Sequence, residues 1–128
     1  LIRTVVLLPQ PDKQAEIGFF LRNDFRGQGI MSVAAPQVVK KAANIGWFDT
    51  LYATTHPMNG PSIAILKKLG LRYIERIAVS RYMERDGITP APRLYFSGTL
   101  ADVKDALQRA AMASRASKQV RDYFPIKP

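Results

Sequence analysis

The feature that most constrains this chain is a strand-like run followed by a glycine-bearing basic loop and a long helical pattern. Residues 15–21 are apolar except for Glu16 and contain two phenylalanines, residues 26–29 read Arg-Gly-Gln-Gly, and helical periodicity resumes at Ile30. Loop N–H groups and the first turn of a helix point donors at one spot, and the helix dipole favours negative charge there. The stretch therefore favours an anion site, although such turns also serve as ordinary connectors.

The charge balance also favours an anionic partner. The 128-residue chain carries 19 basic and 10 acidic side chains, a formal net charge of +9. Such an excess attracts phosphorylated cofactors, nucleic acids or acidic surfaces without distinguishing among them. The sequence has no cysteine, which excludes disulfides, thiolate zinc sites and a cysteine nucleophile, and no metal site is predicted. The length suits one domain. Because no apolar run has the length of a membrane span and no signal peptide is visible, we expect a cytoplasmic protein without a membrane partner.

Apolar periodicity predicts strands that alternate with helices, which indicates an α/β (α+β) fold. The turn chemistry of residues 10–13 favours a hairpin between the first two strands. Gly46 and Gly70 mark helix ends, and Pro61 suits the start of the second helix, where its missing N–H is no loss. We expect strands at residues 1–8, 16–21, 48–54, 71–83 and 93–97, and helices at residues 30–45, 62–69 and from residue 100 onward.

Two helices carry further expectations. Pro36 lies well beyond the first turn of the first helix, so that helix is either kinked there or begins later than the loop suggests. Thr99 and Asp102 resemble a capping box at the start of the last helix. We expect residues 1–99 to form the main domain. Residues 100–128 are expected to form a C-terminal helix and a basic, mobile tail that pack on this domain or extend from it.

Two motifs resemble those of the GNAT superfamily of N-acetyltransferases. Residues 26–31, Arg-Gly-Gln-Gly-Ile-Met, resemble its acetyl-coenzyme A signature, Arg/Gln-x-x-Gly-x-Gly/Ala. Asn59-x-x-Ser62 and residues 66–71, Leu-Lys-Lys-Leu-Gly-Leu, resemble a segment of the branch that acetylates ribosomal-protein N-termini and spermidine. One helix and one strand separate the two motifs, as in the family.

The resemblance implies a fold and an activity. The fold would be a GNAT-like mixed, mainly antiparallel central sheet flanked by helices. The activity would be transfer of an acetyl group from acetyl-coenzyme A to a primary amine by direct attack, with a small-molecule amine or a peptide N-terminus as acceptor. The family's first strand and two helices have no counterpart ahead of residue 8. We therefore expect an N-terminally reduced fold, as a fragment or a natural variant, whose exposed sheet edge would favour a homodimer.

The sequence is also compatible with functions other than catalysis. The alternative to an active enzyme is a catalytically inactive or truncated GNAT-like domain that binds coenzyme A or another anion. A nucleic-acid-binding module rests on net charge alone, because the sequence shows neither a recognition motif nor aromatic residues interleaved on a basic face.

The resemblance also implies which residues hold acetyl-coenzyme A. The pyrophosphate would lie on the loop N–H groups at the helix start, and the pantetheine chain would run beside the end of the second strand. Asn59 would bind the pantetheine or order its loop, and Lys67 or Lys68 would reach the 3′-phosphate. The expected cofactor-binding residues are Phe20, Leu21, Arg22, Arg26, Gly27, Gln28, Gly29, Ile30, Met31, Asn59, Ser62 and Lys68.

Glu16 and Ser62 are the expected catalytic residues. Glu16 lies where some family members carry a catalytic glutamate, and it would take the proton from the substrate amine. Ser62 would protonate the departing thiolate or position a water. The backbone N–H near Leu21 would stabilise the negative charge that develops on the carbonyl oxygen.

Each of these residues also has a purely structural interpretation. Glu16 could be a solvated strand residue, and Ser62 could be a helix cap. Asn59 could only set a turn. Lys67 and Lys68 could belong to a solvated helix face.

Overall fold

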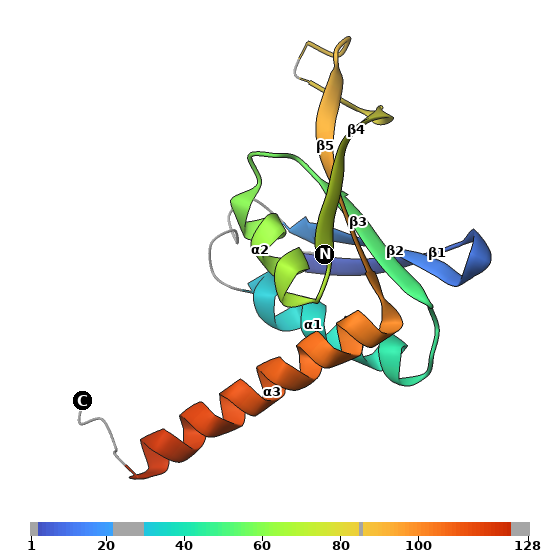
Figure 1. The fold of residues 1–128 in the computed structure, drawn as a ribbon. Coiled ribbons are helices and arrows are strands. Elements are labelled where there is room, and N and C mark those ends of the chain that lie inside the picture. Colours follow the sequence, from blue (N-terminus) through green and yellow to red (C-terminus); the bar gives the residue numbers. More distant parts are fainter. Residues whose placement is uncertain (1–2, 22–29, 85, 124–128) are drawn as a thin grey trace.

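The computed structural model describes residues 3–21, 30–84 and 86–123. These residues form a five-stranded sheet and three α-helices (Figure 1). The strands are β1 (Arg3–Gln10), β2 (Gln14–Leu21), β3 (Thr50–Thr55), β4 (Arg72–Met83) and β5 (Pro90–Thr99), and the helices are α1 (Ile30–Asn44), α2 (Gly60–Lys68) and α3 (Leu100–Tyr123), with a 3₁₀ turn, η1, at Pro11–Lys13. The predicted mixed sheet flanked by helices is confirmed.

The strand order is β1-β2-β3-β5-β4. Antiparallel pairing of β1 with β2 runs from Arg3 opposite Leu21 to Gln10 opposite Gln14, which confirms the predicted hairpin. Strands β2 and β3 are parallel, and α1 makes the crossover that a parallel pair requires. Strand β5 pairs antiparallel with both β3 and β4, so the sheet is mainly antiparallel, as expected.

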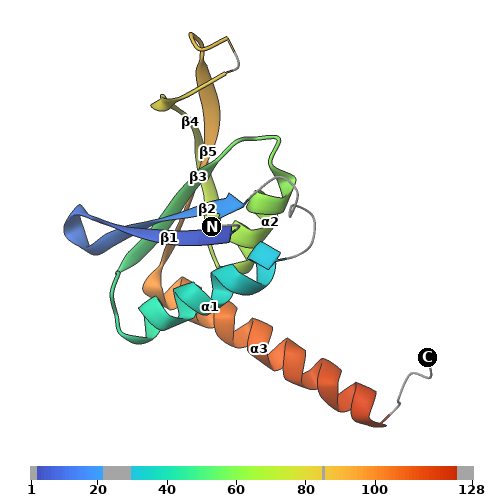
Figure 2. The same cartoon turned by 180° about the vertical axis from the view of Figure 1, so that it is seen from behind.

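One face of the sheet forms the hydrophobic core together with the inner sides of the three helices. Alternation along the strands sends Ala15 and Ile17 of β2 to this face, together with Leu51 and Ala53 of β3, and each is at most 3% exposed. The helical part of the same cluster consists of Ala35, Val39, Ala42 and Ala43 of α1, Ile65, Leu66 and Leu69 in and after α2, and Val103 of α3. All three helices therefore pack on one face. In Figures 1 and 2, the first turns of α3 lie next to α1, and the two helices then run in different directions.

Helix α1 begins at Ile30 and continues through Pro36 to Asn44, so a later start of this helix is ruled out. Proline at this position removes one backbone hydrogen bond of the helix. Ala35 and Val39, on either side of Pro36, are completely buried in the core. Tertiary packing of this apolar stripe therefore outweighs the local cost of the proline.

Two elements extend away from the core, the β4–β5 hairpin and the C-terminal half of α3 (Figures 1 and 2). Strand β5 has ten residues, twice the expected length, because it extends beyond both ends of the predicted range 93–97. It begins at Pro90, and the first residue of a strand tolerates proline. Helix α3 continues to Tyr123 through residues that we expected to form a tail. This part of the sequence is rich in alanine, lysine, arginine and glutamine, which are strong helix formers even without an apolar stripe.

None of the helices in the described ranges combines the length and hydropathy that crossing a membrane requires.

Gly70 closes α2 where this helix meets α3. Its φ of 91° lies in the left-handed region, and its N–H donates to the Lys67 carbonyl at 3.0 Å. A Cβ at this position would lie 2.6 Å from the Asp102 carbonyl oxygen and 2.9 Å from the Ala106 Cβ. Only glycine fits this close approach without displacing backbone.

We expect Gly70→Ala to lower the free energy of unfolding by roughly 1–3 kcal/mol or more, because backbone strain and a steric clash act together. Gly87→Ala is the matched control. Gly87 has a φ of 70°, but a Cβ added to it would meet no atom within 4 Å. Urea denaturation of both variants measures the difference. Equal losses of unfolding free energy in the two variants would show that the close approach of α3 to Gly70 adds nothing to the cost of the substitution.

The capping box at the start of α3 is confirmed. The Thr99 N–H donates to Asp102 Oδ2 at 3.1 Å, and the Asp102 N–H donates to Thr99 Oγ1 at 3.1 Å. Arg72 Nη2 lies 3.5 Å from the same carboxylate. The hydrogen bonds from the Thr99 backbone and side chain, assisted by the Arg72 charge, lower the pKa of Asp102 below its usual value.

This lowered pKa predicts a pH-dependent effect of Asp102→Ala. The ionised carboxylate stabilises the folded state above about pH 4, and this contribution is lost as the pH falls through the folded-state pKa. The variant should melt below the wild type at pH 7, and the two melting temperatures should converge in acid. Glu75→Ala, which removes an exposed carboxylate from β4, is the control. A difference in melting temperature that is independent of pH would contradict the prediction.

Candidate functional site

Strands β2 and β3 separate after three residue pairs. They pair from Gln14 opposite Thr50 to Glu16 opposite Tyr52, whereas β2 continues to Leu21. Among the described residues, the facing edges of residues 17–21 and 53–55 share no strand pairing, and we call this opening the fork. Figures 1 and 2 show the two strands running in different directions. Backbone N–H and C=O groups need partners, so a fork of this kind suits an extended ligand that carries amides.

Glu16 lies at the closed end of the fork. It is the last β2 residue that pairs with β3, and its other partner is Leu8 of β1. Its neighbours Ala15 and Ile17 point into the core, so Glu16 points to the opposite face of the sheet. The side chain is only 7% exposed. The interpretation of Glu16 as a solvated strand residue is therefore wrong.

The face that carries Glu16 is lined by polar and aromatic side chains. We call Glu16, Tyr52, Thr54, Arg93 and Tyr95 the polar face. The rings of Tyr52 and Tyr95 are 5.7 Å apart between centroids and tilted by 35°. Arg93 donates from Nη2 to the Thr54 carbonyl at 2.8 Å and from Nε to Thr54 Oγ1 at 3.3 Å. The buried helix residues of the core cluster lie on the other side of the sheet.

Asn59, not Ser62, caps the start of α2. Asn59 Oδ1 accepts the Ser62 N–H at 3.2 Å, and the Asn59 carbonyl accepts the Ile63 N–H at 3.1 Å. Pro61 occupies the first turn, as predicted. The interpretation of Ser62 as the cap is wrong, and its side chain is buried in this turn, 9% exposed. Of the two roles expected for Asn59, the structure shows the one that orders the loop.

His56 holds the loop that leads into α2. Its Nδ1 accepts the Met58 N–H at 3.1 Å, and its carbonyl accepts the Asn59 N–H at 2.9 Å. Its Nε2 lies 3.9 Å from Glu84 Oε1 at the end of β4. The sequence offered no signal for this role, because a single loop histidine belongs to no pattern.

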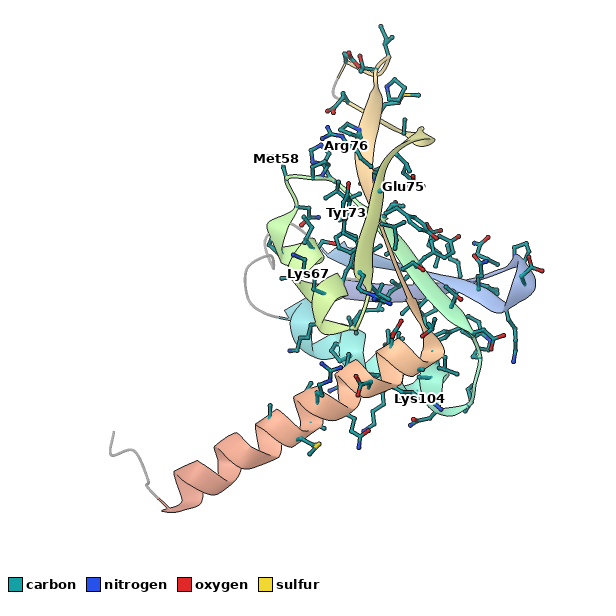
Figure 3. The ribbon with its side chains drawn as sticks, in the orientation of Figure 1. Met58, Lys67, Tyr73, Glu75, Arg76 and Lys104 are labelled. Atoms are coloured by element: carbon teal, nitrogen blue, oxygen red, sulfur yellow. The ribbon has the colours of Figure 1, made fainter. Side chains whose placement is uncertain are left out.

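Lys67 and Lys68 lie in the last turn of α2, and both are exposed. Figure 3 shows Lys67 on the outer side of this helix. The nine-residue helix separates Lys68 from Asn59 by about 13 Å. Cations at this end also complement the helix dipole.

The basic loop lies outside the described residues, although both of its flanks are described. Strand β2 ends at Leu21 and α1 begins at Ile30, so the predicted strand before this segment and the predicted helix after it are confirmed. Arg22, Arg26, Gly27, Gln28 and Gly29 fall in the undescribed range 22–29. Phe20, Leu21, Ile30 and Met31 are described by their backbone alone.

A family model and solved structures place the chain among known proteins. The model of the acetyltransferase (GNAT) domain matches residues 3–72. The chain belongs to the GNAT acetyltransferase family. No curated protein sequence matches it.

Solved acetyltransferases share this GNAT fold. The ribosomal-protein-S5-alanine acetyltransferase from Vibrio fischeri matches with a TM-score of 0.67 and 20% identity, over 80% of this chain and 56% of that one. Mycobacterium smegmatis RimJ, solved with CoA-disulfide, matches with a TM-score of 0.70 and 24% identity, over 89% and 55%. RimL, a ribosomal L7/L12 α-N-protein acetyltransferase solved with coenzyme A, matches with a TM-score of 0.62 and 22% identity, over 74% and 54%.

These matches confirm the predicted GNAT-like fold. The neighbours include ribosomal-protein acetyltransferases, the branch that the sequence motifs indicated. The chain spans 54–56% of the length of these three proteins.

The cap of α2 generates a prediction. Asn59→Ala should lower the free energy of unfolding by about 1 kcal/mol, because the Ser62 N–H loses its acceptor. Asn59→Asp keeps a side-chain acceptor at the helix start and should retain the wild-type stability. Chemical denaturation compares the three proteins. Equal stability of Asn59→Ala and wild type would show that the cap hydrogen bond does not stabilise α2.

Proposed function

We propose that this chain is an N-acetyltransferase domain that transfers an acetyl group from acetyl-coenzyme A to a primary amine by direct attack. The observation that carries the proposal is the fork, with a nearly buried glutamate at its closed end. Membership of the GNAT family supports acetyl transfer, and two neighbours were solved with coenzyme A or its disulfide. The acceptor class is a small amine or a peptide N-terminus.

Backbone groups would bind most of the cofactor. The pantetheine amides would pair with the fork-side edge of β2 near Phe20, Leu21 and Arg22, as an added strand does. The pyrophosphate would lie on the N–H groups of residues 26–31, where α1 begins and its dipole favours anions. The Asn59 amide group would donate to the pantetheine while its oxygen caps α2. Lys68 would reach the 3′-phosphate.

The side chains at the fork would carry the proton transfers. Acetyl-coenzyme A supplies a thioester whose C–S bond breaks as the amine nitrogen forms the new C–N bond. Glu16 would accept the proton that the amine loses, from its position on the polar face. The N–H near Leu21 would stabilise the carbonyl oxygen as negative charge develops. The Ser62 hydroxyl would protonate the departing sulfur or position a water.

A second candidate is a GNAT-like domain that binds coenzyme A without catalysis. The observation that favours it is the start of α2, where Asn59 caps the helix and Ser62 is buried, so that both motif residues already have structural roles. In either case, we also propose a homodimer through an edge strand, β1 or β4, and a main domain that ends at residue 99.

Calorimetry with coenzyme A and a thiol-release assay over a panel of amines test both candidates. We expect coenzyme A binding, turnover of at least one amine, and a kcat about 100-fold lower in Glu16→Gln with unchanged affinity for coenzyme A. Asp105→Asn removes a remote carboxylate and should behave as wild type. Gly29→Trp should abolish coenzyme A binding.

The outcomes separate the candidates. Binding without turnover on any amine would favour the second candidate. No binding at millimolar coenzyme A would overturn the cofactor assignment. A fully active Glu16→Gln would remove Glu16 from the proposed role of base.

A further inference from the structure

Arg93 is a cation held in place on the same sheet face as Glu16. It lies on β5 opposite Ile77 of β4, and its side chain is half-buried. The two hydrogen bonds to Thr54 orient the guanidinium over β3. An arginine oriented in this way suits a planar anion such as a carboxylate, which it can bind with two parallel hydrogen bonds.

Glu16 and the Arg93 guanidinium lie beside β3 positions that are two residues apart. Glu16 lies beside Tyr52, and the Arg93 guanidinium contacts Thr54, two residues further along the same strand. Two residues of a strand span about 7 Å, and an extended peptide has the same rise. A peptide whose terminal amine reaches Glu16 therefore places its third residue near Arg93.

The surface between these two groups suits such a peptide. Tyr52 pairs with Glu16 and Tyr95 pairs with Thr54, and the two rings contact each other and offer apolar area with polar tips. The net charge of +9 attracts acidic acceptors to the chain as a whole. On the side of β5 away from β3, Tyr95 pairs with Glu75 of β4, whose side chain is exposed.

We propose that Arg93 determines acceptor specificity by binding a carboxylate of the substrate. The preferred acceptor is then a peptide N-terminus with an acidic side chain at its third residue. This inference rests on the proposed function and adds the class of acceptor to it.

Matched peptides test the proposal. They share a free N-terminus and differ in carrying glutamate at the third residue, glutamine at the third residue, or glutamate at the sixth. Thiol release should give a kcat/KM about tenfold higher for glutamate at the third residue than for the other two. Equal values for the three peptides would overturn the proposal without any variant.

Variants then assign the preference to Arg93. Arg93→Gln should remove the preference for glutamate, and Arg93→Glu should reverse it, so that the peptide with glutamine at the third residue becomes the better substrate. Arg76→Gln removes the same charge from the other side of β4, where Figure 3 shows Arg76 and Glu75 pointing in opposite directions, and should keep the preference. A preference that survives Arg93→Gln would overturn the assignment.

A binding measurement distinguishes failure of this inference from failure of the proposed function. If no peptide is acetylated, fluorescence anisotropy of the same peptides, labelled and with coenzyme A present, measures their binding affinities. A tenfold higher affinity for glutamate at the third residue, lost in Arg93→Gln, would support the inference in a chain without catalysis. Equal affinities, or no binding, would overturn it. Thermal melts of each variant check that it is folded.

Discussion

The short parallel pairing of β2 and β3 is the constraint on which the rest of this structure depends. Three residue pairs hold the two strands together, and beyond Glu16 and Tyr52 their facing edges part. Each strand stays ordered because its other edge is fully paired, β2 with β1 and β3 with β5. The fork-side edge of β2 then presents backbone donors and acceptors that an amide-bearing ligand can satisfy, whereas on β3 the Thr54 carbonyl already accepts from Arg93.

All three helices pack on one face of the sheet, and this arrangement also determines what the other face carries. It produces a single core and leaves the opposite face to polar and aromatic side chains. Glu16, Tyr52 and Arg93 come from three different strands and meet on that face only because the sheet order brings β5 between β3 and β4. The same order brings Glu16 and Arg93 to neighbouring positions along β3.

Local sequence signals correctly predicted the elements whose ends are set by a single turn or cap residue. Gly70 ends α2, Asn59 and Ser62 mark its start, and Thr99 with Asp102 opens α3. The roles of Asn59 and Ser62 could not be separated, because either side chain can cap a helix and only the helix boundary decides between them. The length of α3 was missed because its outer half lacks the apolar stripe on which the prediction relied, although its helix propensity is high.

The sequence by itself determined the family and the order of the elements. These follow from periodicity and from turn, cap and loop residues, which act over a few positions of the chain. Only the tertiary structure decided that Glu16 is buried, that His56 holds the α2 loop and that Arg93 lies near the fork. Arg93 and Glu16 are 77 positions apart in the sequence, and strand register across three strands, not any local pattern, brings them to one face.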